Sequence, residues 1–95
     1  MKNQRYILKD NEPQPCGNLE KWAMWMDESN CRIACHEIGG VSISTVFLGV
    51  ASYDIDGVPV LFETMVLLSN SVRRYTTYQQ AVAGHAQTIH DLSTV

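Results

Sequence analysis

The chain has 95 residues, enough for one hydrophobic core but too few for a core with a separate substrate lobe, so we expect a single domain over residues 1–95. With 45% hydrophobic and 18% charged residues, the composition is typical of a folded domain and not of a disordered chain. The formal net charge of -3 argues against nucleic-acid binding, because surfaces that bind duplexes gain affinity by neutralising many phosphates.

The N-terminal third is predicted to hold one strand and one helix. Residues 5–8 are typical of a short strand, and residues 10–17, with two prolines and a glycine, are typical of a loop. From Leu19 onward apolar residues recur at helical spacing, and Asn18 stands where an N-cap is needed. This pattern predicts an amphipathic helix that ends near Ser29.

Three strands follow, over roughly residues 32–38, 41–53 and 58–68, all rich in Val, Ile, Phe and Thr. Gly39-Gly40 and Asp56-Gly57 separate them, and both pairs favour tight hairpin turns. We therefore expect the strands to form a meander.

The C-terminal segment predicts a second helix. Thr76 and Gln79 can form a capping box at its start. Its apolar face would carry Tyr78, Ala81, Val82, His85, Ile89 and Leu92. The order β-α-β-β-β-α predicts an α+β fold, a two-layer sandwich in which two helices pack on one face of a mainly antiparallel sheet of about four strands.

Alternation along the strands divides their side chains between two faces. The face under the helices would carry Ala34, His36, Ile38, Val41, Ile43, Phe47, Gly49, Ala51, Val60, Phe62, Thr64 and Val66. The other would carry Cys31, Ile33, Cys35, Val46, Leu48, Val50, Leu61, Met65 and Leu67, interrupted by Ser42, Ser44, Ser52 and Glu63.

This second face is too apolar for a solvated surface, and no helix is left to cover it. We therefore predict a homo-oligomer, most simply a homodimer, that buries it. The alternatives are that the helices divide between the two faces, or that a bulge or a three-residue turn reverses the register of one strand.

Glu63 and His85 are the residues that could transfer protons. His85 lies on the apolar side of the last helix, where a histidine is more often a buried, hydrogen-bonded residue than a base or a ligand. Glu63 stands in mid-strand among apolar residues, so its carboxylate must be paired, desolvated or placed at an opening in the interface. The face assignment puts the two on opposite sides of the sheet, and an acid/base pair fails if that assignment holds.

No other pattern supports a catalytic, metal or cofactor site. Cys16, Cys31 and Cys35 form no CxxC pair, and Cys35 and His36 are strand neighbours whose side chains point to opposite faces. The chain also has no Gly-rich phosphate loop, GxSxG elbow, HExxH helix or EF-hand loop. We predict no catalytic residue, no metal and no cofactor, and enzymatic activity has no positive support.

Trp25, Arg73, Arg74 and Tyr75 are candidates for binding. Trp25 lies one position off the apolar stripe of the first helix, where its indole either anchors a partner or wraps over the edge of the core. The other three, with Tyr78, lie at the mouth of the last helix, where an anionic small ligand could be held, although exposed arginines beside a loop are usually solvated.

The segments VSISTVFLG, LFETMV and RYTTYQQAVAGH, with YIL, EPQPC and LEKWAMWM before them, resemble a family of small phage and prophage proteins. The resemblance runs from about Tyr6 to His85 and includes Glu63 and Thr64. It implies a compact accessory protein that acts inside an infected or lysogenic bacterium, and it transfers no catalytic residue.

Localisation is predicted to be the cytoplasm of the host bacterium. No apolar run approaches the length of a membrane span, and no signal-like apolar stretch follows residues 1–5, so we expect no membrane partner.

Three functions remain as hypotheses. The first is an oligomeric, non-enzymatic interaction module that binds a host protein or a defence component. The second is a protein that binds or sequesters a small anionic, nucleotide-like ligand at a subunit boundary around Glu63, Arg73 and Arg74. The third is a small enzyme that uses Glu63 and His85, which requires these side chains to converge.

Overall fold

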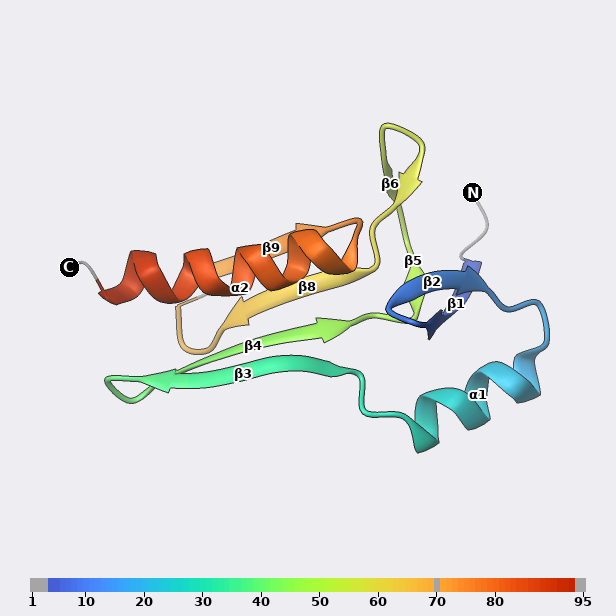
Figure 1. The fold of residues 1–95 in the computed structure, drawn as a ribbon, viewed down its shortest axis with the longest axis horizontal. Coiled ribbons are helices and arrows are strands. Elements are labelled where there is room, and N and C mark those ends of the chain that lie inside the picture. The colour runs from blue at the N-terminus through green and yellow to red at the C-terminus, as the bar shows by residue number, and fades with distance from the viewer. Residues whose placement is uncertain (1–3, 70, 94–95) are drawn as a thin grey trace.

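The computed structural model describes residues 4–69 and 71–93 (Figure 1). In chain order the elements are β1 (Gln4–Lys9), β2 (Glu12–Pro15), α1 (Leu19–Glu28), β3 (Arg32–Ile38), β4 (Val41–Phe47), β5 (Val50–Ala51), β6 (Asp54–Ile55), β7 (Val58–Pro59), β8 (Phe62–Val66), β9 (Ser71–Tyr75) and α2 (Tyr78–Ser93). Two helices with antiparallel strands confirm the predicted α+β fold within these residues.

The main layer is a four-stranded antiparallel sheet in the order β3-β4-β8-β9. Helix α2 lies along one face of this sheet and contacts all four strands (Figure 1). Gly39 and Gly40 close the β3–β4 hairpin with positive φ angles of 57° and 82°, which a residue with a side chain rarely adopts. This hairpin was predicted from the glycine pair.

The predicted faces hold for β4 and β8. The side chains buried on the α2 side include Ile43, Thr45, Phe47, Phe62, Thr64 and Val66. Their pairing is in register, with Thr45 opposite Thr64 and Phe47 opposite Phe62.

Three residues assigned to the other face, Cys31, Ile33 and Leu61, instead join the core cluster. A β-bulge lies between Arg32 and Ala34, so Ile33 is an extra residue that breaks the simple alternation of β3. Leu61 precedes the paired part of β8 and belongs to the buried cluster that also contains Tyr6 of β1.

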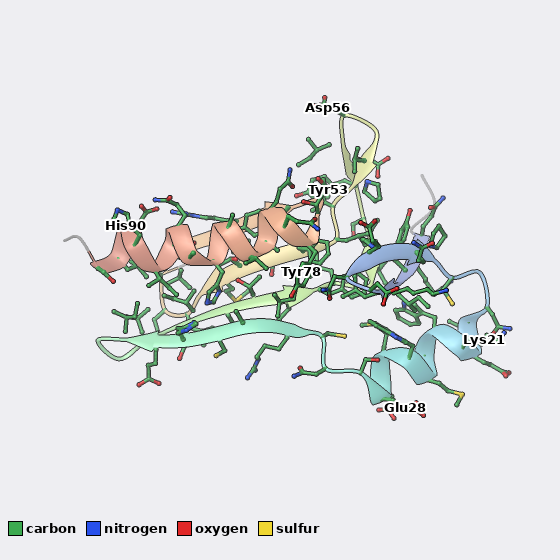
Figure 2. The ribbon with its side chains drawn as sticks, in the orientation of Figure 1. Lys21, Glu28, Tyr53, Asp56, Tyr78 and His90 are labelled. Atoms are coloured by element: carbon green, nitrogen blue, oxygen red, sulfur yellow. The ribbon has the colours of Figure 1, made fainter. Side chains whose placement is uncertain are left out.

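The prediction that both helices pack on one face is wrong for α1. The short strand β5 leaves the main sheet and pairs with β1, and α1 packs against β1. The Trp22 indole N–H donates to the Gly49 carbonyl at 3.1 Å, and the Trp25 ring meets the Phe47 ring edge-on at 5.7 Å. The turn at Gly49, with φ at 77°, directs β5 from the main sheet to β1. Helix α1 packs there, beyond the end of the main sheet, with Lys21 and Glu28 near its two ends (Figure 2).

Two strands extend the sheets in segments where the sequence predicts no strand. Residues 10–17 contain β2, which pairs with β1 through a tight turn at Asp10 and Asn11, both at positive φ. β9 follows the β8 turn and supplies the fourth strand of the main sheet.

The predicted strands over residues 41–53 and 58–68 are each interrupted. Between β4 and β8 the chain forms β5 and the small β6–β7 hairpin. Asp56 marks the tip of this hairpin, which projects from the body of the molecule (Figure 2), and its turn at Asp56-Gly57 confirms the predicted one.

Helix α2 begins one residue later than the predicted capping box. The Gln80 backbone N–H donates to the Thr77 hydroxyl at 3.1 Å, and the Gln80 side-chain oxygen accepts from the Thr77 N–H at 3.3 Å. These reciprocal bonds form the capping box with Thr77 and Gln80, whereas Thr76 and Gln79 were predicted.

Candidate functional site

The surface of the main sheet opposite α2 is the first candidate site. We call this surface the open face. It carries a cavity of about 520 Å³, lined by Arg32, Cys35, Ser42, Ser44, Val46, Glu63, Met65 and Leu67. Among the elements of residues 4–69 and 71–93, α2 covers the other side of this sheet and α1 contacts β1, so neither helix covers the open face.

Glu63 lines this surface and is ion-paired. Its carboxylate accepts from the Arg74 guanidinium at 3.1 Å, with the Glu63 side chain 15% exposed and that of Arg74 47% exposed. The carboxylate of Glu63, followed by Tyr53, raises the pKa of Arg74. Glu63 also lines a second cavity, of about 390 Å³, beside Tyr53 and Arg74. Of the alternatives for Glu63, the ion pair is the one present.

One edge of the open face is apolar. Met65, Leu67 and Val72 are 39%, 47% and 39% exposed, and Leu68, in the turn after β8, is 96% exposed. Leu68 also has a φ of 73°, a conformation that costs a branched side chain energy. The turn thus displays a leucine that contributes nothing to the core.

The second candidate site is a chain of hydrogen bonds beneath α2. His85 is 4% exposed, and its Nδ1 lies 2.7 Å from the Thr45 hydroxyl. The Thr45 hydroxyl lies 2.5 Å from that of Thr64, which accepts from the Tyr75 hydroxyl at 3.0 Å. On the other side of the imidazole, His85 Nε2 lies 2.8 Å from Nδ1 of the exposed His36. Four strands and one helix therefore meet in one polar network.

Counting donors fixes the direction of these bonds. Tyr75 donates to Thr64, and Thr64 is buried, so the Thr64 hydrogen has the Thr45 oxygen as its acceptor. Thr45 must then donate to His85 Nδ1, which leaves the His85 proton on Nε2, directed at His36 Nδ1. In this arrangement every buried hydroxyl and imidazole N–H of this hydrogen-bond network has an acceptor.

This environment favours a neutral His85. Burial lowers the pKa of the imidazole below its usual value, and the charge that His36 can acquire lowers it further. His85 is thus the buried, hydrogen-bonded residue that its position on the apolar side of the helix predicted.

Gly84 allows the helix to lie this close to the sheet. A Cβ built at Gly84 would overlap the hydroxyl and the ring of Tyr75. In the Ala-Gly-His segment, Gly84 therefore leaves space for Tyr75, and His85 belongs to the same hydrogen-bond network as Tyr75.

The other predicted site residues do not converge. Arg73 reaches the helix side and pairs with Asp91 at 2.7 Å, near the C-terminal end of α2, whereas Arg74 reaches Glu63 on the open face. Tyr75 takes part in the buried network, and Trp25 packs on Phe47 at the edge of the core. The anionic-ligand site predicted at the mouth of α2 is therefore not assembled from Arg73, Arg74 and Tyr75.

Glu63 and His85 lie on opposite sides of the sheet, as the face assignment predicted, because neighbouring Thr64 belongs to the His85 network while Glu63 lines the open face. The enzyme hypothesis that needs them in one cleft is therefore contradicted. Within residues 4–69 and 71–93, no three His, Cys, Asp or Glu side chains are grouped as a metal site requires.

The sequence analysis missed two hydrogen-bond partners of His85, namely His36 and Thr45. The sequence did contain a signal for His36, because alternation along the strand places it on the sheet face under the helix that carries His85. What the sequence lacks is the alignment along the sheet, which brings a strand residue and a helix residue 49 positions apart into contact.

Comparison with protein-family models, curated proteins and solved structures finds no significant match to this chain. No helix in the described part of the chain has the length and apolar character needed to cross a membrane.

Proposed function

We propose that this protein is a non-enzymatic interaction module that self-associates through its open face. The observation that carries the proposal is the one-sided coverage of the main sheet: α2 contacts all four strands on one side, and the opposite side carries apolar residues around a cavity. Apolar surface of this kind on a folded domain usually marks an interface.

A second copy of the chain is the occupant that the chemistry of the open face favours. Two copies related by a two-fold axis present the same patch to each other, so the patch must complement itself. The open face contains apolar Val46 and Met65, the hydroxyls of Ser42 and Ser44, and charges of both signs at Arg32 and Glu63. Such a mixture can pair apolar with apolar side chains and opposite charges across the axis.

The biological setting of the proposal follows from the resemblance to phage and prophage proteins. In that setting the dimer acts in the cytoplasm of the host bacterium and binds a host protein or a defence component. We assign that contact to Leu68, which is 96% exposed in the turn after β8 and is not among the residues that line the open face.

The test is the mass of the purified protein in solution, measured by light scattering over a concentration series. We expect a dimer for the wild type and a monomer for Met65→Lys, because each Met65→Lys dimer would bury two unpaired ammonium groups. The dissociation constant should rise at least about 100-fold.

Val82→Lys is the matched control, since Val82 is 45% exposed on α2, close to the 39% of Met65. Val82→Lys should leave the dimer intact, and circular dichroism should report folded protein for both variants. A wild type that stays monomeric up to hundreds of micromolar contradicts the proposal.

A small anionic ligand is the alternative occupant. The two cavities of about 520 and 390 Å³ share Glu63 and are lined by the cationic side chains of Arg32 and Arg74. A thermal shift of the wild type with nucleotides, lost in Arg32→Gln, would support a binding or sequestering protein. No shift with any nucleotide would favour the protein partner.

A further inference from the structure

The histidine pair beneath α2 has a property that the proposed function does not use. His36 comes from β3 and His85 from α2, so the 2.8 Å contact between their ring nitrogens is one of the links that join the helix to the edge strand of the sheet. Histidine is also the side chain whose charge ordinarily changes between about pH 5 and pH 8.

We propose that His36 and His85 form an acid-sensitive latch that fastens α2 to the main sheet, holds with one bound proton and opens with two. The latch lies on the opposite side of the sheet from the open face.

The first proton is accommodated by reversing the hydrogen-bond chain. His36 then carries hydrogens on both ring nitrogens and donates from Nδ1 to His85 Nε2, while His85 donates from Nδ1 to Thr45. Thr45 donates to Thr64, Thr64 donates to Tyr75, and the hydroxyl hydrogen of half-buried Tyr75 turns to water. One proton has been added, no heavy atom has moved, and every buried donor again has an acceptor.

The second proton cannot be accommodated in the closed structure. It would have to bind His85 Nε2, which then presents an N–H to the Nδ1–H of His36 across 2.8 Å. Two imidazolium cations would face each other with no acceptor between them, and one of them would be buried. Separating α2 from β3 gives both rings to water, so the open state binds the second proton more tightly.

The groups packed around His36 and His85 do not change how many protons the closed structure accommodates. On the helix side of the sheet, β4 and β8 contribute the uncharged Thr45 and Thr64. From β9 come Tyr75, which is part of the chain, and Arg73, whose charge is paired with Asp91 of α2 at 2.7 Å. No carboxylate among the described residues is hydrogen-bonded or ion-paired to His36 or His85.

The test on the wild-type protein is ¹⁵N NMR of the imidazole nitrogens during a pH titration. At pH 8 His85 should be the Nε2–H tautomer. As His36 takes up its proton, His85 should convert to the neutral Nδ1–H tautomer before it becomes charged. A merely structural histidine would keep one tautomer, so an unchanged Nε2–H form down to the pH of unfolding overturns the proposal.

The opening of the latch is measured by amide hydrogen exchange in α2, corrected for the intrinsic effect of pH. Because the open state binds one more proton, the opening equilibrium should rise by up to about tenfold per pH unit once His36 is charged. His36→Gln removes the second charge but leaves His85 buried, so it should abolish the tautomer change and make this rise less steep without removing it. His90→Gln, which removes an exposed histidine of the same helix, should behave as the wild type. Equal pH dependence in His36→Gln and wild type contradicts the latch.

Discussion

Thr45 is the centre of the buried network, and Thr45→Val tests how much that network contributes to stability. Valine has nearly the shape of threonine and is at least as favourable in a strand, so neither packing nor strand propensity should suffer. The change removes the oxygen that accepts from Thr64 and the hydrogen donated to His85 Nδ1. Both partners are buried, so water cannot replace the lost bonds.

The expected cost follows from the number of groups left without a partner. Each buried polar group without a hydrogen bond costs about 1–3 kcal/mol, and the added methyl group recovers less than about 1 kcal/mol. With two such groups, we expect Thr45→Val to lower the free energy of unfolding by about 1–6 kcal/mol. The measurement is urea unfolding monitored by circular dichroism at pH 7.5, with equal slopes for wild type and variant.

Thr88→Val is the matched control. Thr88 is 2% exposed, like the network threonines, but its hydroxyl donates to the Gly84 carbonyl one turn earlier in α2 and leaves no buried donor behind when removed. It should change stability by no more than about 1 kcal/mol. If Thr45→Val costs no more than Thr88→Val, the hydrogen-bond network does not hold the helix, and the argument for the histidine pair loses its basis.

Three further predictions concern close packing, the attachment of α1 and pH. Gly84→Ala should destabilise by about 2 kcal/mol despite the helix preference of alanine, because the new Cβ overlaps Tyr75, whereas Gly17→Ala, in open space, should stay within about 0.5 kcal/mol in the same unfolding assay. Trp22→Phe should cost about 1 kcal/mol through the lost bond to the Gly49 carbonyl, and an unchanged unfolding midpoint would contradict that bond. Because the pKa of His85 is lowered in the folded state, stability should be complete above the ordinary histidine value of about 6.5 and decline as pH falls below it, and a stability flat from pH 8 to pH 5 would refute this.

Much of the fold could be predicted because it depends on local patterns. The Gly39-Gly40 and Asp56-Gly57 turns, the Asn18 cap of α1 and the alternation of β4 and β8 are properties of a few adjacent residues. The same alternation separated Glu63 from His85 correctly.

What could not be predicted depends on contacts between distant segments. The bulge at Ile33 moves that side chain to the core side, and nothing in the sequence around it marks the extra residue. β5 pairs with β1 instead of extending the main sheet, and this pairing takes α1 away from the face where two helices were expected. The contact between His36 and His85 was missed for the same reason, since it requires the position of α2 along the sheet.

The pairing of β1 with β5 also bears on how the protein is made. Gln4 of β1 pairs with Ala51, and the Trp22 indole of α1 donates to the Gly49 carbonyl. Both of these long-range contacts can form only after residues 49–51 have been synthesised. The first hairpin and α1 must therefore leave the ribosome without their core, with Trp22 and Trp25 exposed. Folding of the N-terminal third is expected to wait for the strands that follow it, which makes the interval before β5 emerges the period of greatest exposure to chaperones and proteases.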